Sequence, residues 1–291
     1  MKSHIQQSER SFIRWIQLVL LVPCIVLGTV DIPVHADELK PETNAAFDRY
    51  IAVTEARMDD DVRRDEFLVI DRLPASSRQE AYEQVHQNQI YMEELHTQKG
   101  NLPITIPDGV IHHWAGVMFI PKATLSEAIG VIEDYANQSN TYSPEIRRSK
   151  LIGQSGNEAK IYIQFANKLI ITVVLNVYFD VSDAQFGSTR RQATSRSTRI
   201  AEVANPGSAD EYERPADSAH GYMWRFNNYW RIDERDGGVY IQNESITLSR
   251  TFPPIISWVF TPLMNSVPSD VLLRLLTDTR KAVMKSGLKP K

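Results

Sequence analysis

The sequence predicts an α+β fold in which a curved antiparallel sheet wraps around a long C-terminal helix. Helical patterns stand at both ends of the chain and strand patterns lie between them, a segregation typical of this class. Two long alternating segments, 221–235 and 238–250, are joined through Asp236-Gly237-Gly238, a strong hairpin signal. The last helix, residues 268–285, carries an apolar face that such a sheet can cover.

The composition is that of an ordinary globular protein. Of 291 residues, 42% are hydrophobic and 23% are charged, which excludes a disordered or fibrous chain. The formal net charge of −4 argues against a partner that is a nucleic acid. The chain has one cysteine, Cys24, so it forms no intramolecular disulfide and no cysteine-built metal site.

Residues 1–36 have the pattern of a signal peptide. A basic start precedes an apolar run over residues 15–30, and Val34-His35-Ala36 resembles the small-residue cleavage site of a signal peptide. Pro23 and Gly28 interrupt the run, and an anchor helix needs about 20 clean apolar residues to span a bilayer. Cleavage after Ala36 is therefore favoured over an uncleaved anchor, and the mature protein is expected to be periplasmic or secreted.

Residues 37–89 are expected to form a helical extension that packs on the sheet. Apolar residues at helical spacing predict a helix over 42–58, ended by a solvated acidic loop at residues 59–61. Residues 67–70 are expected to be a short strand or an extended connector. A second helix over 77–87 is expected to begin at Ser77, with Glu80 completing a capping box.

From residue 90 to residue 291 the pattern predicts one domain built on the sheet. Segments 90–97 and 110–120 are expected to form a long hairpin, and residues 122–137 return to helical spacing. Further strands are expected at 158–166, 168–181, 189–204, 221–235 and 238–250.

This order of elements resembles the START-like, helix-grip (SRPBCC) superfamily, which includes Bet v 1-like proteins, polyketide cyclases and lipid-transport proteins. The stretches that carry the resemblance are IHHWAGVMFIPKATLSEAIGVIEDY (111–135), YSPEIRRSKLI (142–152), YMWRFNNYWRIDERDGGVYIQNESITLSR (222–250) and LLRLLTDTRKAV (272–283). They are similar to the exported bacterial branch of the superfamily. The resemblance implies a cavity between the sheet and the last helix that takes a lipid, sterol, quinone or polyketide.

One face of the 221–250 hairpin has the chemistry of a cavity wall. Successive side chains of a strand point to opposite sides, and this face mixes aromatic and aliphatic residues with small polar ones. Its residues are Trp224, Phe226, Asn228, Trp230 and Ile232, with Ile241, Asn243, Ser245 and Thr247 across from them. Aromatic residues are also what a strand packed on the terminal helix would carry, so a core role and a ligand-binding role both stay open.

The other face of the same hairpin is polar and charged. It includes Arg225, Tyr229, Arg231 and Glu244. The simplest interpretation is an exposed row of ion pairs that contributes little stability. If this face were the interior instead, its arginines could hold an anionic head group. Alternation leaves open which face lines the cavity.

Segment 168–181 is nearly continuously apolar. A strand of this kind is covered on both faces, and residues 37–89 are the expected cover. Asn176 and Tyr178 lie on its more polar side and are further cavity candidates. An enzyme would need a general acid–base pair, for which Tyr178, His113, Asp180 and Glu244 are the available groups.

Motifs that would identify a metal or cofactor site do not occur in the sequence. His112 and His113 are neighbours on a predicted strand, so they point to opposite faces and do not chelate one ion together. A phosphate-binding loop, a dinucleotide-binding loop and a serine-hydrolase elbow are also missing. We therefore expect no metal ion and no cofactor, and assign no catalytic residue.

Residues 253–264 are strongly apolar and include Trp258 and Phe260, with Pro262 expected to prevent a clean helix. This segment is either a buried connector under the sheet or a gate that contacts a bilayer transiently while a ligand enters or leaves.

Together these patterns favour an exported, non-catalytic carrier or sensor of a hydrophobic small molecule such as a lipid, a quinone or an isoprenoid. One alternative is an enzyme of the cyclase, aromatase or dehydratase kind that uses the same cavity, which fold similarity alone suggests. The other is a structural or partner-binding protein whose groove is filled by its own side chains.

Overall fold

The computed structural model describes residues 39–168, 172–251 and 254–287, and for residues 168 and 254–266 the backbone only. The chain divides into two units, Met1–His35 and Ala36–Lys291, and every described residue belongs to the second. The predicted signal peptide over residues 1–36 therefore lies outside the described residues, and so do the side chains of Trp258 and Phe260 in the predicted gate.

A sheet of nine antiparallel strands organises the described chain. The small hairpin of β2 (Gln98–Lys99) and β3 (Leu102–Pro103) stands apart from it. The strands of the large sheet, in spatial order, are β1 (Tyr91–Glu94), β4 (Gly109–Pro121), β11 (Gly238–Arg250), β10 (Arg225–Arg235), β8 (Arg190–Ala204), β7 (Thr172–Phe186), β6 (Glu158–Lys168) and β5 (Ile146–Ser155), with β9 (Tyr212–Glu213) paired to β8.

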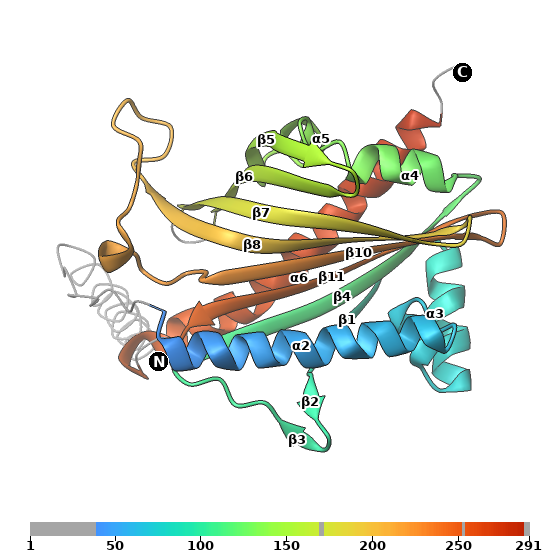
Figure 1. The fold of residues 1–291 in the computed structure, drawn as a ribbon, viewed down its shortest axis with the longest axis horizontal. Helices are drawn as coiled ribbons and strands as arrows, with labels where there is room; N and C mark the ends of the chain where they lie inside the picture. The colour runs from blue at the N-terminus through green and yellow to red at the C-terminus, as the bar shows by residue number, and fades with distance from the viewer. Residues whose placement is uncertain (1–38, 169–171, 252–253, 288–291) are drawn as a thin grey trace, which may run out of the picture. The chain divides into compact units, whose positions relative to one another are not determined.

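The predicted fold class is confirmed. The long helix α6 (Pro254–Ser286), red in Figure 1, crosses one side of the curved sheet, which is the START-like helix-grip arrangement. β10 and β11 turn at Asp236 and Gly237, whose φ angles of 55° and 73° suit the tight two-residue hairpin turn. α6 is a single helix through Pro262, so the predicted break in the helix there is wrong.

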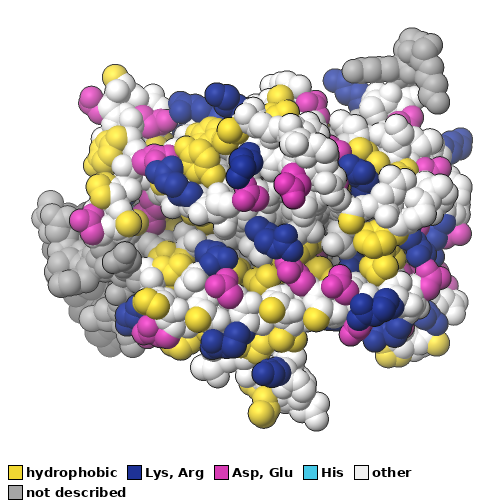
Figure 2. Space-filling model, in the orientation of Figure 1, with side chains coloured by type: hydrophobic (Ala, Val, Ile, Leu, Met, Phe, Trp, Pro, Cys, Tyr) yellow, Lys and Arg dark blue, Asp and Glu magenta, His cyan; other side chains and the backbone are white. Residues whose placement is uncertain are grey.

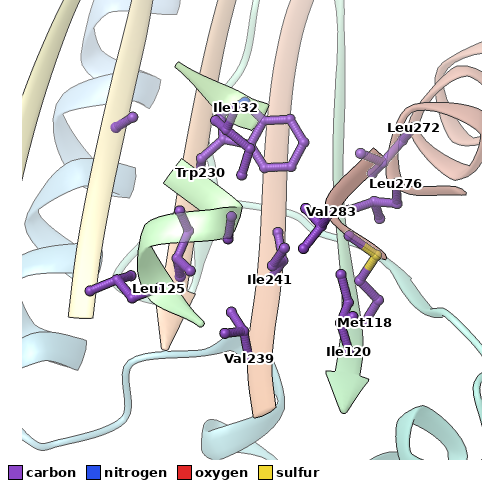
Figure 3. Close-up of a cluster of buried hydrophobic side chains, with 13 residues drawn as sticks. Met118, Ile120, Leu125, Ile132, Trp230, Val239, Ile241, Leu272, Leu276 and Val283 are labelled. Atoms are coloured by element: carbon purple, nitrogen blue, oxygen red, sulfur yellow. The ribbon is translucent and has the colours of Figure 1, made fainter. Parts of the chain in front are cut away.

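On one face of the sheet, α6 and α4 (Leu125–Ile132) bury an apolar cluster. Leu272, Leu276 and Val283 of α6 pack with Ile241 of β11, and Figure 3 shows these side chains gathered beside the strands. Gly116 of β4 permits the close approach of the helix, because an added Cβ would lie 2.5 Å from Leu276 Cδ1. The short α5 (Gln138–Thr141) follows α4.

On the opposite face lies α2 (Pro41–Arg63), which packs on β10 and β11. Its Phe47, Tyr50 and Met58 form a buried cluster with Tyr229 and Ile246 of those strands. The 3-10 helix η1 (Val69–Arg72) and α3 (Ala75–His86) continue this layer over β4, and η2 (Ala216–Ser218) precedes β10. The sheet therefore lies between two helical layers over part of its area.

Three details of the N-terminal prediction are wrong. α2 does not end at residues 59–61, because Asp61 is buried and paired with Arg57 and Arg64. Residues 69–72 form a 3-10 helix and not a strand. α3 begins after Pro74 with no side-chain cap, so the expected capping box at Ser77 is not formed.

The expectation that residues 37–89 cover the 168–181 segment is also wrong. α2 packs on β10 and β11, and the α3 cluster packs on β4, β11 and the end of β7. The polar side of β7 is satisfied differently: Asn176 is buried by contacts from β6 and β9, and Asp180 pairs with Lys160 at the surface.

None of the helices in the described part of the chain combines the length and the apolar character needed to cross a membrane.

Candidate ligand-binding cavity

A cavity of about 190 Å³ lies between the sheet and α6. Its described lining comes from β4, β5, β6, β7, β10 and β11, from α6, and from the segments before β5 and β10. The lining residues are His112, Tyr142, Glu145, Ile146, Phe165, Ala166, Asn167, Val173, Leu175, Tyr222, Met223, Phe226, Asn228, Asn243, Ser245, Thr247, Ser249, Val267, Pro268, Val271, Leu272, Leu275 and Asp278.

The walls of this cavity are apolar. Phe226 of β10 stacks edge-to-face on Phe165 of β6 and Phe179 of β7, with ring centroids 5.8 and 5.4 Å apart. Such pairs hold aromatic side chains in fixed positions. Val271 and Leu275 close the opposite wall from α6. The space is thus framed by rigid aromatic rings on the sheet and by aliphatic side chains on the helix.

The floor of the cavity carries a row of small polar side chains. Asn243, Ser245, Thr247 and Ser249 are alternate residues of β11 and all face the cavity. Strand register adds neighbours on both sides, because Ser245 pairs with Asn228 of β10 and Thr247 pairs with His112 of β4.

The amide of Asn243 is buried without hydrogen bonds. Its side chain is 0% exposed, and neither its Oδ1 nor its Nδ2 has a partner among the described residues. The Oδ1 of Asn228, nearby on the same face, is buried and unpartnered as well. A buried amide in this state destabilises the empty protein by about 1–3 kcal/mol. Both asparagines face the cavity, so a ligand with a polar group can form the hydrogen bonds that they lack.

The titratable groups of the lining are neutral or already paired. Burial lowers the pKa of His112, against an opposing effect of the Glu94 charge. Burial raises the pKa of Tyr142 to about 12, and its hydroxyl lies 3.1 Å from Thr279 Oγ1. The two carboxylates point to cations outside the cavity: Glu145 to Arg274 and Asp278 to Lys281, at 2.6 and 2.8 Å.

Four of the residues predicted for the cavity lie in its lining: Phe226, Asn228, Asn243 and Ser245. Trp230 lines a neighbouring cavity of about 60 Å³, which shares Phe226 and Asn228 with the larger one. Ile241 belongs to the core cluster under α4 and α6, where Figure 3 shows it beside Val283.

Three other predicted cavity residues lie elsewhere. Trp224 packs with the cluster under α2, because β10 begins only at Arg225 and alternation does not extend to residue 224. Asn176 and Tyr178 face the outer side of β7: Asn176 bonds Glu213 and the Tyr162 hydroxyl, and Tyr178 lies 5.2 Å from the Tyr162 ring.

Several lining residues were not assigned from the sequence. Ser249 continues the alternation of β11, so the β11 pattern itself was sufficient to find it. His112 required the register between β4 and β11, and the α6 residues required the position of that helix on the sheet. Residues of β6 and β7 carry only ordinary apolar patterns, which do not distinguish a cavity wall from a core.

The charged face of the hairpin is buried under α2, so the interpretation as an exposed row of ion pairs is wrong. Arg231 is 1% exposed and Glu244 is 0% exposed. Arg231 donates to the carbonyl oxygens of Phe67 and Met58, each at 2.8 Å, and Glu244 is paired with Arg57. These residues do not line the cavity and hold α2 and η1 against the sheet.

Glu244 is the centre of a continuous hydrogen-bonded chain. The Thr97 N–H donates to the Tyr50 hydroxyl at 2.9 Å, and that hydroxyl lies 2.9 Å from His113 Nδ1. His113 Nε2 lies 2.7 Å from Glu244, and burial lowers the pKa of His113, which favours a neutral ring that donates to Glu244. Burial alone would raise the pKa of Glu244, but the charge of Arg57 and the bond from His113 outweigh it and lower the pKa to about 2.

The suggested acid–base groups do not meet in the cavity. His113 and Glu244 form a buried pair on the α2 face, while His112 points to the cavity, as expected for adjacent residues of a strand. Tyr178 and Asp180 lie on the outer side of β7, where Asp180 pairs with Lys160. Within the described residues, no cluster of three or more His, Cys, Asp or Glu side chains is placed to hold a metal ion.

The surface charges are mixed in sign. Arg190, Arg191, Arg196 and Arg199 of β8 are each paired with a carboxylate, those of Asp65, Glu133, Glu55 and Glu213 respectively. On the face seen in Figure 2, basic and acidic side chains are interspersed. These arginines are therefore neutralised by ion pairs with carboxylates from distant segments of the chain and do not form a basic patch.

Comparisons with known proteins find similar solved structures at low sequence identity only. No protein-family model matches the chain, and no curated protein matches its sequence. Among solved structures, it is similar to a STAR-related lipid transfer protein of Xanthomonas axonopodis, with 13% identity, 66% of this chain and 98% of the other covered, and a TM-score of 0.44.

Two further solved structures show the range of this similarity. Human STARD10 has 12% identity over 67% of this chain and 73% of its own, with a TM-score of 0.43. The Zhui aromatase/cyclase of a Streptomyces species has 10% identity over 60% of this chain and 93% of its own, with a TM-score of 0.35. The helix-grip assignment itself depends on the strand order and on the position of α6.

Proposed function

We propose that this protein binds a hydrophobic small molecule in the cavity between the sheet and α6 and acts as a carrier or sensor. The observation that carries the proposal is the apolar space of about 190 Å³, framed by Phe165, Phe226 and Leu275. Apolar surface that remains unfilled contributes no packing energy, so a ligand that fills it gains both burial and contacts.

A non-catalytic role is proposed over the cyclase, aromatase or dehydratase alternative because of the polar groups at the floor. They are amides and hydroxyls, from Asn228, Asn243, Ser245, Thr247 and Ser249, which bind polar atoms but do not exchange protons near neutral pH. The buried pair of His113 with Glu244 lies on the far side of the sheet, and His112 is the one imidazole of the described lining.

Native mass spectrometry with organic extraction, on the protein purified from its source cells, tests the proposal. We expect a co-purifying lipid, quinone or isoprenoid at close to one molecule per chain. The purified protein should also bind the neutral fluorophore N-phenyl-1-naphthylamine. A protein that is empty and binds no fluorophore would support the filled-groove alternative instead.

A pair of variants of α6 sharpens this test. Val271→Trp places a large ring in the cavity and should abolish fluorophore binding. Leu273→Trp makes the same kind of change two residues away, at a side chain that is 42% exposed on the outer side of the helix, and should leave binding unchanged. Equal loss of binding in both variants would place the fluorophore outside this cavity.

We also propose that the protein is exported and works in the periplasm or outside the cell. The support is the pattern of residues 1–36, with its basic start, apolar run and small-residue Val34-His35-Ala36 site. N-terminal sequencing of the protein from fractionated cells should find Asp37 as the first residue in the periplasmic or extracellular fraction. A chain that keeps its first residues in the membrane fraction would show an uncleaved anchor.

A further inference from the structure

The cavity combines two features that together restrict the chemistry of its ligand. Its floor has an amide, Asn243, that is fully buried and makes no hydrogen bond with the described residues. Its described lining includes no lysine or arginine, and both of its carboxylates are paired with solvent-exposed cations that are not part of that lining. The first feature calls for a polar group on the ligand, and the second disfavours a charge on it.

Asn228 gives the polar floor a second position, besides Asn243, that can form hydrogen bonds with a ligand. Asn228 pairs with Ser245 across the hairpin, and Trp230 pairs with Asn243, so the two asparagines are diagonal neighbours on one face, roughly 7–8 Å apart. Asn243 can offer both a donor and an acceptor, and Asn228 can offer its unpartnered Oδ1. The hydroxyl of Ser245 lies between them and can rotate to donate or to accept.

A charged head group finds no counter-ion on this floor. Moving a carboxylate or a phosphate out of water is unfavourable unless a buried cation pairs with it. His112 is the one basic side chain in the described lining, and burial lowers its pKa. It is therefore neutral at pH 7 and can act as a hydrogen-bonding neighbour but not as a counter-ion.

We propose that the cavity selects uncharged ligands that carry a donor–acceptor group, an amide or a hydroxyl, bound by Asn243 and Asn228 with the apolar body against α6. This inference rests on the proposed function, because it names the class of hydrophobic ligand that the same cavity takes.

Three probes of equal chain length separate the head group from the apolar body. Decanamide is neutral and both donates and accepts, decanoate is anionic at pH 8, and decane has no polar group. Each is measured by displacement of N-phenyl-1-naphthylamine from the full, processed protein. Decanamide should bind at least about tenfold more tightly than decane, the gain expected from one or two hydrogen bonds, and at least about tenfold more tightly than decanoate.

Asparagine-to-leucine variants then locate the effect. Asn243→Leu, or Asn228→Leu if the first folds poorly, should remove the preference for decanamide over decane while decane still binds. The matched control is Asn227→Leu, the same change at a buried asparagine on the opposite face of β10, where Asn227 bonds the Tyr229 hydroxyl. The control should keep the preference.

The outcomes separate this inference from the proposed function. If decanoate or decane binds as tightly as decanamide, or if the preference survives in both cavity variants, the head-group inference is overturned while hydrophobic binding stands. If the protein binds none of the three probes and no fluorophore, the proposed function fails and the inference fails with it.

Discussion

Two adjacent buried polar residues of β11 are bonded in opposite ways on the two faces of the sheet. Asn243 and Glu244 are neighbours in the chain and both are 0% exposed. Glu244, on the α2 face, is bonded to Arg57 and His113. Asn243, on the α6 face, has no partner among the described residues. At these two positions the α2 face bonds its buried polar group, and the α6 face leaves it open.

The difference indicates what each face is for. Buried polar groups that are fully bonded fix the position of a structural element, and here they attach α2 and η1 to the sheet. Buried polar groups left without partners reduce stability, so their retention indicates a second requirement such as binding. On this view, substitutions on the α2 face should change stability, and substitutions on the cavity face should change binding.

The largest expected effect is at Glu244, the centre of the bonded network on the α2 face. Glu244→Gln keeps the shape of the side chain but removes one of the two buried carboxylates near Arg57 and Arg231, leaving Asp61 as the other. We expect a loss of about 3–5 kcal/mol in the free energy of unfolding, measured by urea denaturation at pH 7. The control, Asp180→Asn, removes a carboxylate from the exposed pair with Lys160 and should cost far less. Equal effects would show that the buried network is not stabilising.

The pH dependence of stability should follow the same network. The pKa of Glu244 is about 2 in the folded protein, below its ordinary value of 4.5, so its contribution is complete above pH 4.5 and is lost as the pH falls to about 2. This shift corresponds to about 3 kcal/mol. Burial also lowers the pKa of His113 and His112, so the unfolded state takes up protons first as the pH falls below about 6.5.

Urea denaturation at several pH values between 7 and 2 measures this effect. Asp183, whose pKa is raised by burial to about 6, contributes with the opposite sign, so the comparison of two proteins is needed to isolate Glu244. The difference between the unaltered protein and Glu244→Gln should shrink between pH 4.5 and 2. A difference that stays constant over that interval would contradict the lowered pKa of Glu244.

Substitutions at two adjacent residues, Gln242 and Asn243, compare the two faces through smaller expected changes in stability. Gln242, on the α2 face, accepts from the Val69 N–H at 2.6 Å, so Gln242→Leu leaves that N–H unpaired and should cost about 1–3 kcal/mol. Asn243→Leu removes an amide that has no partner and should raise the stability of the empty protein by about 1 kcal/mol. Thermal unfolding of the ligand-free proteins measures both changes. If both substitutions change the stability in the same direction, the two faces do not differ in the way described here.

The sequence was sufficient to predict which hairpin residues share a face, because alternation and the Asp236-Gly237 turn determine it locally. It was not sufficient to predict which face is covered by which helix. Glu244 is buried by Arg57, which lies 187 positions away in the chain, and no local pattern encodes that contact. Trp224 was misplaced for a smaller reason, since the strand begins one residue later and the alternation does not apply to it.

Only part of the cavity was predictable, because the sequence shows local patterns but not contacts between distant segments. The polar row from Asn243 to Ser249 is a local pattern of one strand, whereas the apolar walls of the cavity come from β5, β6, β7 and β10 and from α6. The outer position of Asn176 and Tyr178 depends on which side of β7 faces α6, and a strand with apolar residues on both sides gives no signal for that choice.

The prediction with the smallest expected effect tests the position of Tyr178 on the outer side of β7. Tyr178→Phe keeps the ring that lies 5.2 Å from Tyr162 and under the Arg199 guanidinium, and removes only the hydroxyl. The free energy of unfolding should change by no more than about 0.5 kcal/mol, and fluorophore binding should stay the same. Phe226→Leu, which removes a ring from the cavity wall, should weaken fluorophore binding in the same titration. A severalfold loss of affinity in Tyr178→Phe would instead mean that the outer side of β7 contributes to ligand binding.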